Sequence, residues 1–169
     1  QGPGALSAIG GDFALAAWDG AKSRGLLAID RIGILQLVYA RIDDGLAFAS
    51  TLDTLLRHPG VKRELSHQAV FDYLYFHVCP GPQTIYRDLY RVPPAHFVEF
   101  GTGINAQPRS YWSMRFAEDA RHDFASLKDR FVTLVQNAVA AAAEGAPCGA
   151  FLSGGTDSST VSGMLGRTT

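Results

Sequence analysis

The residues best suited to chemistry form one short segment near the end of the chain: Ser153-Gly154-Gly155-Thr156-Asp157-Ser158-Ser159. An apolar run precedes this segment, and a stretch that can form a helix follows it. This order predicts a buried strand at 148–152, a glycine turn and the start of a helix. Such a turn leaves backbone N–H groups unpaired where the helix dipole attracts anions, and glycines let the main chain approach a bulky anion closely. The segment therefore predicts a site for a nucleotide phosphate.

The side chains of the segment add to this prediction. Ser153, Ser158 and Ser159 supply hydroxyl donors, and Asp157 can hold a divalent metal that neutralises phosphate oxygens. The simpler alternative is that Asp157 or Ser158 only caps a helix and the glycines only form the turn. No lysine stands beside the glycines, so this is not the loop that grips the β- and γ-phosphates in kinase-like ATPases. Contact through backbone and hydroxyls suits a reaction in which pyrophosphate leaves.

The segment 151–159 resembles the pyrophosphate loop of the N-type ATP pyrophosphatases, and Gly149-Ala150 before it narrows the resemblance to the asparagine synthetase branch. Further stretches resemble the same family in the same order along the chain, at 11–19, 30–39, 80–87, 92–96 and 111–112. The chain departs from the family pattern at Gln36, Ala95 and Thr156, none of which carries a group that the chemistry needs.

This resemblance implies a fold of the α+β class joined to α/β structure. Residues 1–113 would be the C-terminal part of a type 2 glutamine amidotransferase domain, with the antiparallel two-sheet αββα architecture of the N-terminal-nucleophile class. Residues 114–169 would begin the ATP-binding synthetase domain, as the first αβα step of a doubly wound parallel sheet. A polar, charged stretch at 113–122 marks the expected boundary.

The resemblance also implies an activity. In the family, a glutaminase releases ammonia from glutamine, and a synthetase uses ATP and Mg²⁺ to adenylate aspartate before ammonia displaces AMP. The resemblance assigns six loop residues to binding the pyrophosphate moiety of ATP: Leu152, Ser153, Gly154, Gly155, Asp157 and Ser158. Asp157 would also contact Mg²⁺. The expected partners are ATP, aspartate or another carboxylate, and glutamine as the ammonia donor. The resemblance leaves open whether the protein forms a homodimer.

The chain begins with Gln1, and its first cysteine is Cys79. We therefore expect no N-terminal cysteine nucleophile, no catalytic residue within this chain, and an inactive internal fragment. Two alternatives remain open. A β-lactam synthetase or lasso-peptide cyclase shares the loop but closes a ring, and a non-catalytic remnant would serve as a scaffold.

Composition excludes some partners. The net charge of −1 gives no electrostatic reason to bind nucleic acid or a membrane. No apolar stretch approaches the roughly 20 residues that span a bilayer. Cys79 and Cys148 fit reduced thiols, and together these features predict a cytoplasmic protein.

Hydrophobic periodicity predicts the elements that must position the loop. Hairpins are expected from 13–18 with 26–30 and from 36–42 with 46–49, the second through an Asp-Gly turn. A strand is expected at 95–100, followed by a turn and another strand towards Trp112. Helices are expected at 51–58, at 66–77 with Ser66 as the cap, and at 123–144.

Overall fold

The structure is a computed structural model that describes residues 2–43, 45–118, 123–145 and 147–168. The chain divides into two compact units, Gln1–Arg115 and Phe116–Thr169. Within the described part of the chain, every helix is too short or too polar to span a membrane.

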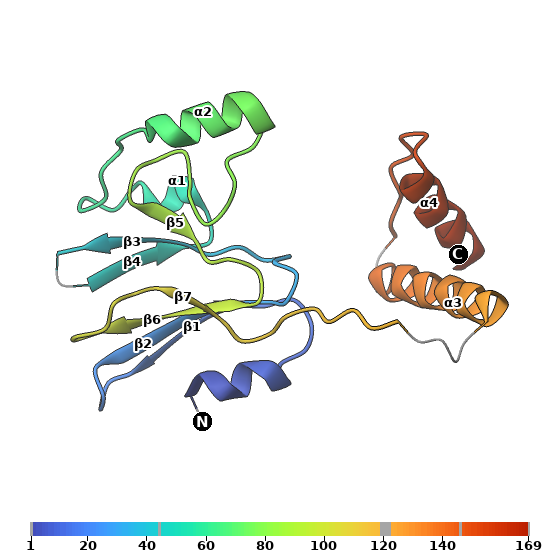
Figure 1. Cartoon of the computed structure of the whole chain (residues 1–169), viewed down its shortest axis with the longest axis horizontal. Coiled ribbons are helices and arrows are strands. Elements are labelled where there is room, and N and C mark those ends of the chain that lie inside the picture. The colour runs from blue at the N-terminus through green and yellow to red at the C-terminus, as the bar shows by residue number, and fades with distance from the viewer. Residues whose placement is uncertain (1, 44, 119–122, 146, 169) are drawn as a thin grey trace. The chain divides into compact units, whose positions relative to one another are not determined.

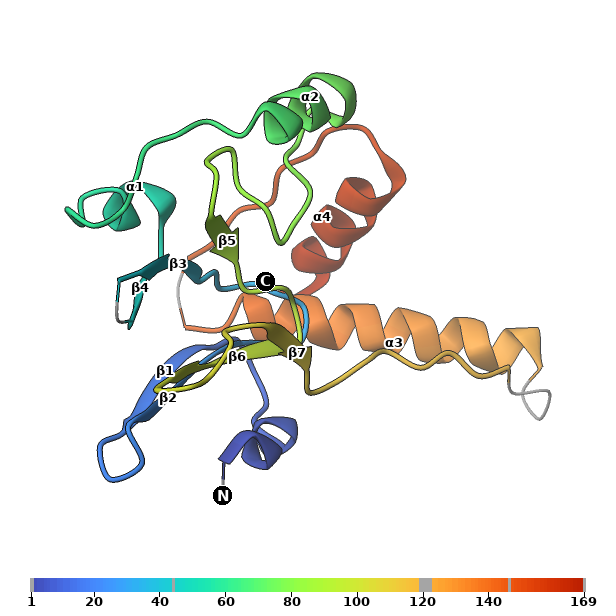
Figure 2. The ribbon, with the colours of Figure 1, turned by 60° about the vertical axis from the view of Figure 1, so that its left-hand side comes forward.

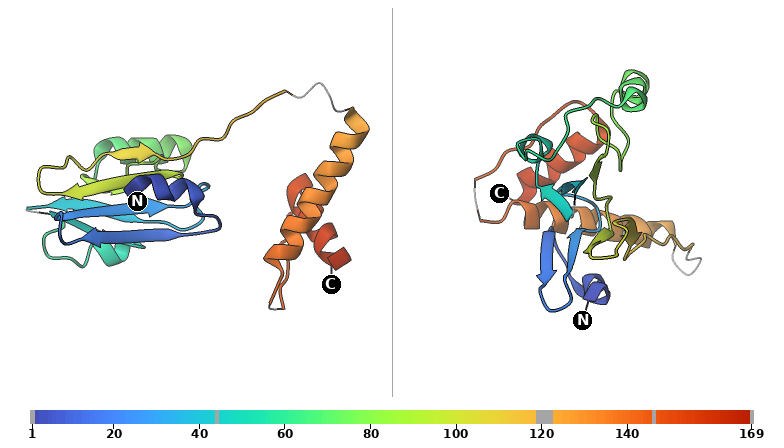
Figure 3. Two further views of the ribbon diagram at one scale, coloured as in Figure 1. Left: turned by 90° about the horizontal axis from the view of Figure 1, so that it is seen from below. Right: turned by 90° about the vertical axis from the view of Figure 1, so that its left-hand side faces the viewer.

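The first unit contains a four-stranded antiparallel sheet in the order β1-β2-β6-β7 (Figure 1). Its strands are β1 (Ala14–Asp19), β2 (Arg24–Ile29), β6 (His96–Gly101) and β7 (Pro108–Ser110). The predicted first hairpin and the strand near 95–100 are confirmed, and the right-hand view of Figure 3 shows the β1–β2 hairpin beside the N-terminal 3₁₀ helix η1 (Gly2–Ala8), which was not predicted.

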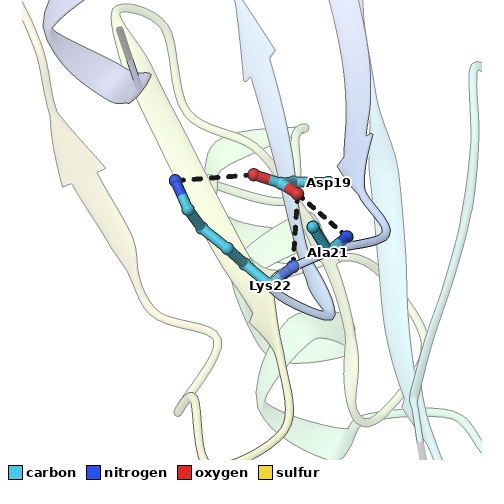
Figure 4. Close-up of polar contacts among 3 residues, drawn as sticks. All are labelled: Asp19, Ala21 and Lys22. Atoms are coloured by element: carbon cyan, nitrogen blue, oxygen red, sulfur yellow. Dashed lines mark hydrogen bonds and ion pairs between the residues drawn. The ribbon is translucent and has the colours of Figure 1, made fainter.

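The turn of this hairpin is fixed by Asp19. Its Oδ1 accepts the backbone N–H groups of Ala21 at 3.1 Å and Lys22 at 3.2 Å, and its Oδ2 lies 3.6 Å from the Lys22 ammonium (Figure 4). Aspartate bonds readily to the backbone two or three residues further on, which explains why this residue type begins the turn.

A second antiparallel sheet has the order β4-β3-β5. Its strands are β3 (Val38–Ile42), β4 (Gly45–Ala49) and β5 (Leu89–Arg91). The predicted hairpin between β3 and β4 is confirmed, although Asp44 of its turn lies outside the described residues. Strand β5 was not predicted, because three residues are too few to show an alternating pattern.

The first unit is layered (Figures 1 and 2). Helix η1 covers the outer face of the first sheet, where Leu6 packs with Ala28 and Phe97. The central core lies between the sheets and includes Leu27 and Val98, which are fully buried. On the outer face of the second sheet, Leu55 and Leu56 pack against strand residues. Two faces of each sheet are thus occupied, as expected for two stacked sheets with flanking helices.

The helices of the first unit are short. Helix α1 (Leu52–Leu55) is only half as long as predicted, and Thr51 caps it by accepting the Thr54 N–H. Helix α2 (His67–Phe76) has the predicted limits, with Ser66 accepting the Ala69 N–H and His77 closing the helix at φ +58°.

The carboxylate of Asp30, at the end of β2, organises the turn that follows. Asp30 is 2% exposed, and it accepts backbone N–H groups from four successive residues, 32–35, at 2.7–3.1 Å. Gly33 takes φ +76°, which a side chain would resist and which keeps these N–H groups convergent. Burial raises the pKa of Asp30, but the four donors outweigh burial and leave the pKa below its usual value.

The second unit consists of helix α3 (Phe124–Ala142), an irregular connection and helix α4 (Thr156–Thr168), and the two helices contact each other (Figure 1). Asp123 caps α3 by accepting the Ser126 N–H at 2.8 Å, as the start of the predicted helix requires.

The predicted buried strand at 148–152 is wrong for this structure. These residues have no regular secondary structure, and Phe151 and Leu152 are 98% and 69% exposed. A strand exists only when a neighbouring strand accepts its backbone hydrogen bonds, and the described residues of the second unit contain no other strand. The expected αβα step is therefore an α-loop-α arrangement here, and no parallel sheet forms among the described residues.

Candidate functional site

The glycine-rich segment forms the N-terminal approach to α4. Gly154 adopts φ +82°, a conformation that side-chain-bearing residues rarely take. No atom outside the neighbouring residues lies within 4 Å of the place where a Cβ of Gly154 would stand. The chain then turns through Gly155 into α4 at Thr156. The turn and the helix start predicted for this segment are confirmed.

Two serine side chains close the turn upon itself. Ser153 and Ser158 have their hydroxyl oxygens 2.8 Å apart, and the Ser153 N–H donates to Ser158 Oγ at 3.3 Å. Ser158 in turn donates its hydroxyl proton to the Gly155 carbonyl at 3.1 Å. Since one hydroxyl has one proton, Ser153 must donate in the contact between the two hydroxyls. Both serines therefore stand on the same side of the turn.

Asp157 lies in the first turn of α4, where its negative charge is favoured by the helix dipole. It lines a mainly apolar cleft of about 580 Å³ formed by α3, α4 and the irregular connection. Ser158 and Phe151 line the same cleft. The structure thus brings Ser153, Asp157 and Ser158 together at one helix start, and leaves Leu152 exposed beside them.

The described residues contain no group of three or more histidine, cysteine, aspartate or glutamate side chains that could hold a metal. Asp157 would be a single carboxylate ligand. This arrangement fits Mg²⁺, which keeps several waters and is commonly held by one or two carboxylates together with substrate phosphates.

Cys79 and Cys148 are both free thiols. Cys79 is half-buried, and its thiol faces the Ala69 carbonyl of α2 at 3.6 Å. Cys148, which we expected inside a buried strand, is exposed.

The sequence did not reveal a second group of polar side chains in the first unit. Tyr39, Arg41, Asp88 and Tyr90 line a cavity of about 480 Å³ beside β3 and β5. Tyr39 and Arg41 alternate along one strand, which hints that they share a face, but β5 was needed to join them to Asp88 and Tyr90.

Models of known protein families match residues in both units. Residues 1–112 match the family model described as a glutamine amidotransferase domain, and residues 130–169 match the model described as asparagine synthase. The chain belongs to the asparagine synthetase family. The two antiparallel sheets of the first unit are consistent with a domain of the glutaminase type.

Individual relatives of this asparagine synthetase family chain are distant. It is 27% identical to asparagine synthetase [glutamine-hydrolyzing] 3 of Bacillus subtilis, over 92% of this chain and 25% of that protein. It is 28% identical to a putative asparagine synthetase of Mycobacterium bovis, over 96% and 26%. It is also 26% identical to amidase chyE of Penicillium rubens, over 95% and 24%. The chain therefore spans about a quarter of the length of the curated relatives that it matches.

Proposed function

We propose that this chain is part of a glutamine-dependent asparagine synthetase that forms AMP, and that residues 152–158 hold the pyrophosphate moiety of ATP. The observation that carries the proposal is the turn at the start of α4, with Gly154 at φ +82° and two serines on one side. The family membership of the chain supports a ligase that uses glutamine.

The turn offers the donors that a polyphosphate needs. The first N–H groups of α4 have no carbonyl within the helix to accept them, so they are available to an anion. Ser153 and Ser158 now bond to each other, and both hydroxyls can turn towards a phosphate oxygen when one arrives. Leu152, immediately before the turn, would contact the nucleoside through its backbone.

Asp157 would hold Mg²⁺ against the phosphates. A bound Mg²⁺ neutralises charge on the leaving pyrophosphate. The reaction that this arrangement serves is adenylation of a carboxylate. A carboxylate is a poor acyl electrophile, and conversion to a mixed anhydride with AMP provides a good leaving group for attack by ammonia.

The role of Asp157 can be tested by ATP–pyrophosphate exchange in a whole protein that contains this chain. Asp157→Ala should abolish the exchange, because the metal loses its carboxylate. Asp129→Ala, which removes an exposed carboxylate from α3, is the matched control and should leave the exchange intact. Exchange at the unchanged rate in the Asp157 variant would refute the proposed role.

The ammonia donor in this proposal is glutamine, handled by the domain that includes residues 1–112. In a whole protein that contains this chain, Asp157→Ala should leave the release of ammonia from glutamine unchanged, because Asp157 belongs to the turn at the start of α4. Measurement of ammonia with the purified variant tests this, and a loss of release would place Asp157 in the glutaminase reaction as well.

A second candidate is amide chemistry on an acceptor other than aspartate. The fungal relatives named amidases favour it, since they match the chain as well as the synthetases do. Exchange that depends on added aspartate would favour the asparagine synthetase, whereas exchange that requires another carboxylate would favour the second candidate or a ring-closing relative. The free thiols of Cys79 and Cys148 support a cytoplasmic location for either enzyme.

A further inference from the structure

The cavity beside β3 and β5 has the size of a small-molecule site. Its volume is about 480 Å³, within the range of ligand pockets. Tyr39 and Tyr90 are register partners in the β3–β5 ladder, with ring centroids 5.7 Å apart, and they therefore rise from the same face of the sheet. Arg41, two residues after Tyr39 on β3, belongs to this face as well.

Tyr39 brings a hydroxyl donor to the cavity. The residue is 3% exposed, but among the described residues Ser162 alone has a fully buried side-chain oxygen without a partner. The Tyr39 hydroxyl therefore reaches the open space of the cavity, where it can donate to a ligand. Burial raises the pKa of Tyr39, Arg41 lowers it and Tyr90 raises it, and the net increase keeps the phenol protonated and able to donate.

Arg41 brings a positive charge and unused hydrogen-bond donors to the cavity. One terminal nitrogen donates to Asn105 Oδ1 at 2.5 Å and to the Ala106 carbonyl at 2.9 Å. The remaining two guanidinium nitrogens have no partner among the described residues. A guanidinium held at one edge in this way can present its other edge to a carboxylate in a two-point contact.

Asp88 brings a carboxylate to the same cavity. It accepts only a long contact of 3.4 Å from the Tyr90 hydroxyl in the described structure, so most of its acceptor capacity is unused. Its backbone is held at φ +61°, an unusual conformation for a residue with a side chain. The Asp88 carboxylate would repel a ligand that carried only negative charge. A ligand that also carried an ammonium group could form an ion pair with Asp88.

From these groups we infer that the cavity binds a small zwitterionic amino acid, with its carboxylate at Arg41 and the Tyr39 hydroxyl and its ammonium group at Asp88. This site is formed by residues of the first unit alone, and the inference does not depend on the function proposed for the turn at α4.

The test is a titration of the isotope-labelled 169-residue chain with L-alanine, followed by NMR of the backbone amides. We expect saturable shifts at residues 39–41 and 88–90. Acetate and methylammonium each carry half of the charge pattern and should bind at least about ten-fold more weakly. Asp88→Asn and Tyr39→Phe change the site without changing its volume greatly, and we expect losses of about ten-fold and about five-fold respectively.

Arg57→Gln is the control, because Arg57 is exposed and does not line the cavity, and it should bind L-alanine as the parent chain does. The spectrum outside the cavity reports whether each variant keeps its fold. The inference is overturned if no saturable shift occurs up to about 50 mM L-alanine. It is equally overturned if acetate binds as tightly as L-alanine, or if both Asp88→Asn and Tyr39→Phe bind it unchanged.

Discussion

The two units of this chain differ in what their apolar side chains contact. In the first unit, Leu27 and Val98 lie between two sheets and are fully buried. In the second unit, neither α3 nor α4 has a buried residue, and Phe124 and Phe131 of the apolar stripe of α3 are 83% and 62% exposed. Burial of apolar area is the main force that holds a fold together, so the difference implies that the first unit supplies nearly all of the stability.

The largest expected effect comes from separating the units. Residues 1–115 expressed alone should unfold cooperatively in urea, because their three core clusters lie within that segment. Residues 116–169 alone should show no cooperative transition, because two helices without a buried core are marginal in water. Circular dichroism during denaturation measures both. A sharp transition for the second segment would contradict the comparison.

A matched pair of core substitutions sharpens the comparison. Leu27→Ala should lower the free energy of unfolding by about 3 kcal/mol, because it leaves a cavity between the sheets. Phe131→Ala removes a larger side chain, yet it should cost less than about 0.5 kcal/mol because that ring is mostly exposed. Urea denaturation of the whole chain gives both values. Equal losses would show that α3 is packed more tightly than the structure indicates.

The pH dependence of the first unit should follow Asp30. Its folded-state pKa lies below the ordinary value, so its contribution is present above that value and is lost as pH falls through the folded pKa. Asp30→Asn should cost about 2 kcal/mol at neutral pH, since an amide nitrogen cannot accept the Leu35 N–H. The variant should also lose less stability than the parent between about pH 6 and about pH 3. Parallel stability curves would exclude this role of the carboxylate.

Helix caps give the smallest expected effect. Ser66→Ala removes the cap of α2 and should lower the stability of the first unit by about 1 kcal/mol. Asp123→Ala removes the cap of α3, and it should reduce helicity near residues 124–128 without moving the main unfolding transition. Denaturation reports the first effect and amide exchange the second. A shift of the main transition by Asp123→Ala would mean that both units unfold together.

Turn chemistry made several elements predictable from the sequence. Asp19 and Ser66 bond to backbone groups two or three residues away, so the residue type itself marks the turn or the helix start. The same holds for Asp123 at the start of α3, whereas Gly154 marks its turn because it can adopt φ +82°. These signals are local, and the structure repeats them at the expected positions.

Elements that depend on distant partners were less predictable. The apolar run at 148–152 reads as a strand, but it has no described strand to pair with and lies exposed. Strand β5 is the reverse, because its three residues show no strand pattern in the sequence. They form a strand because they pair with β3, about fifty positions earlier in the chain.

The sequence by itself determined the family-like loop at 152–158, the capped helices and the two hairpins, because each follows from bonds between neighbouring residues. Only the tertiary structure decided which apolar segments are buried and which polar side chains meet in the cavity at Tyr39 and Asp88. Burial and side-chain convergence depend on residues far apart in the chain, and no local pattern records which partner each segment finds.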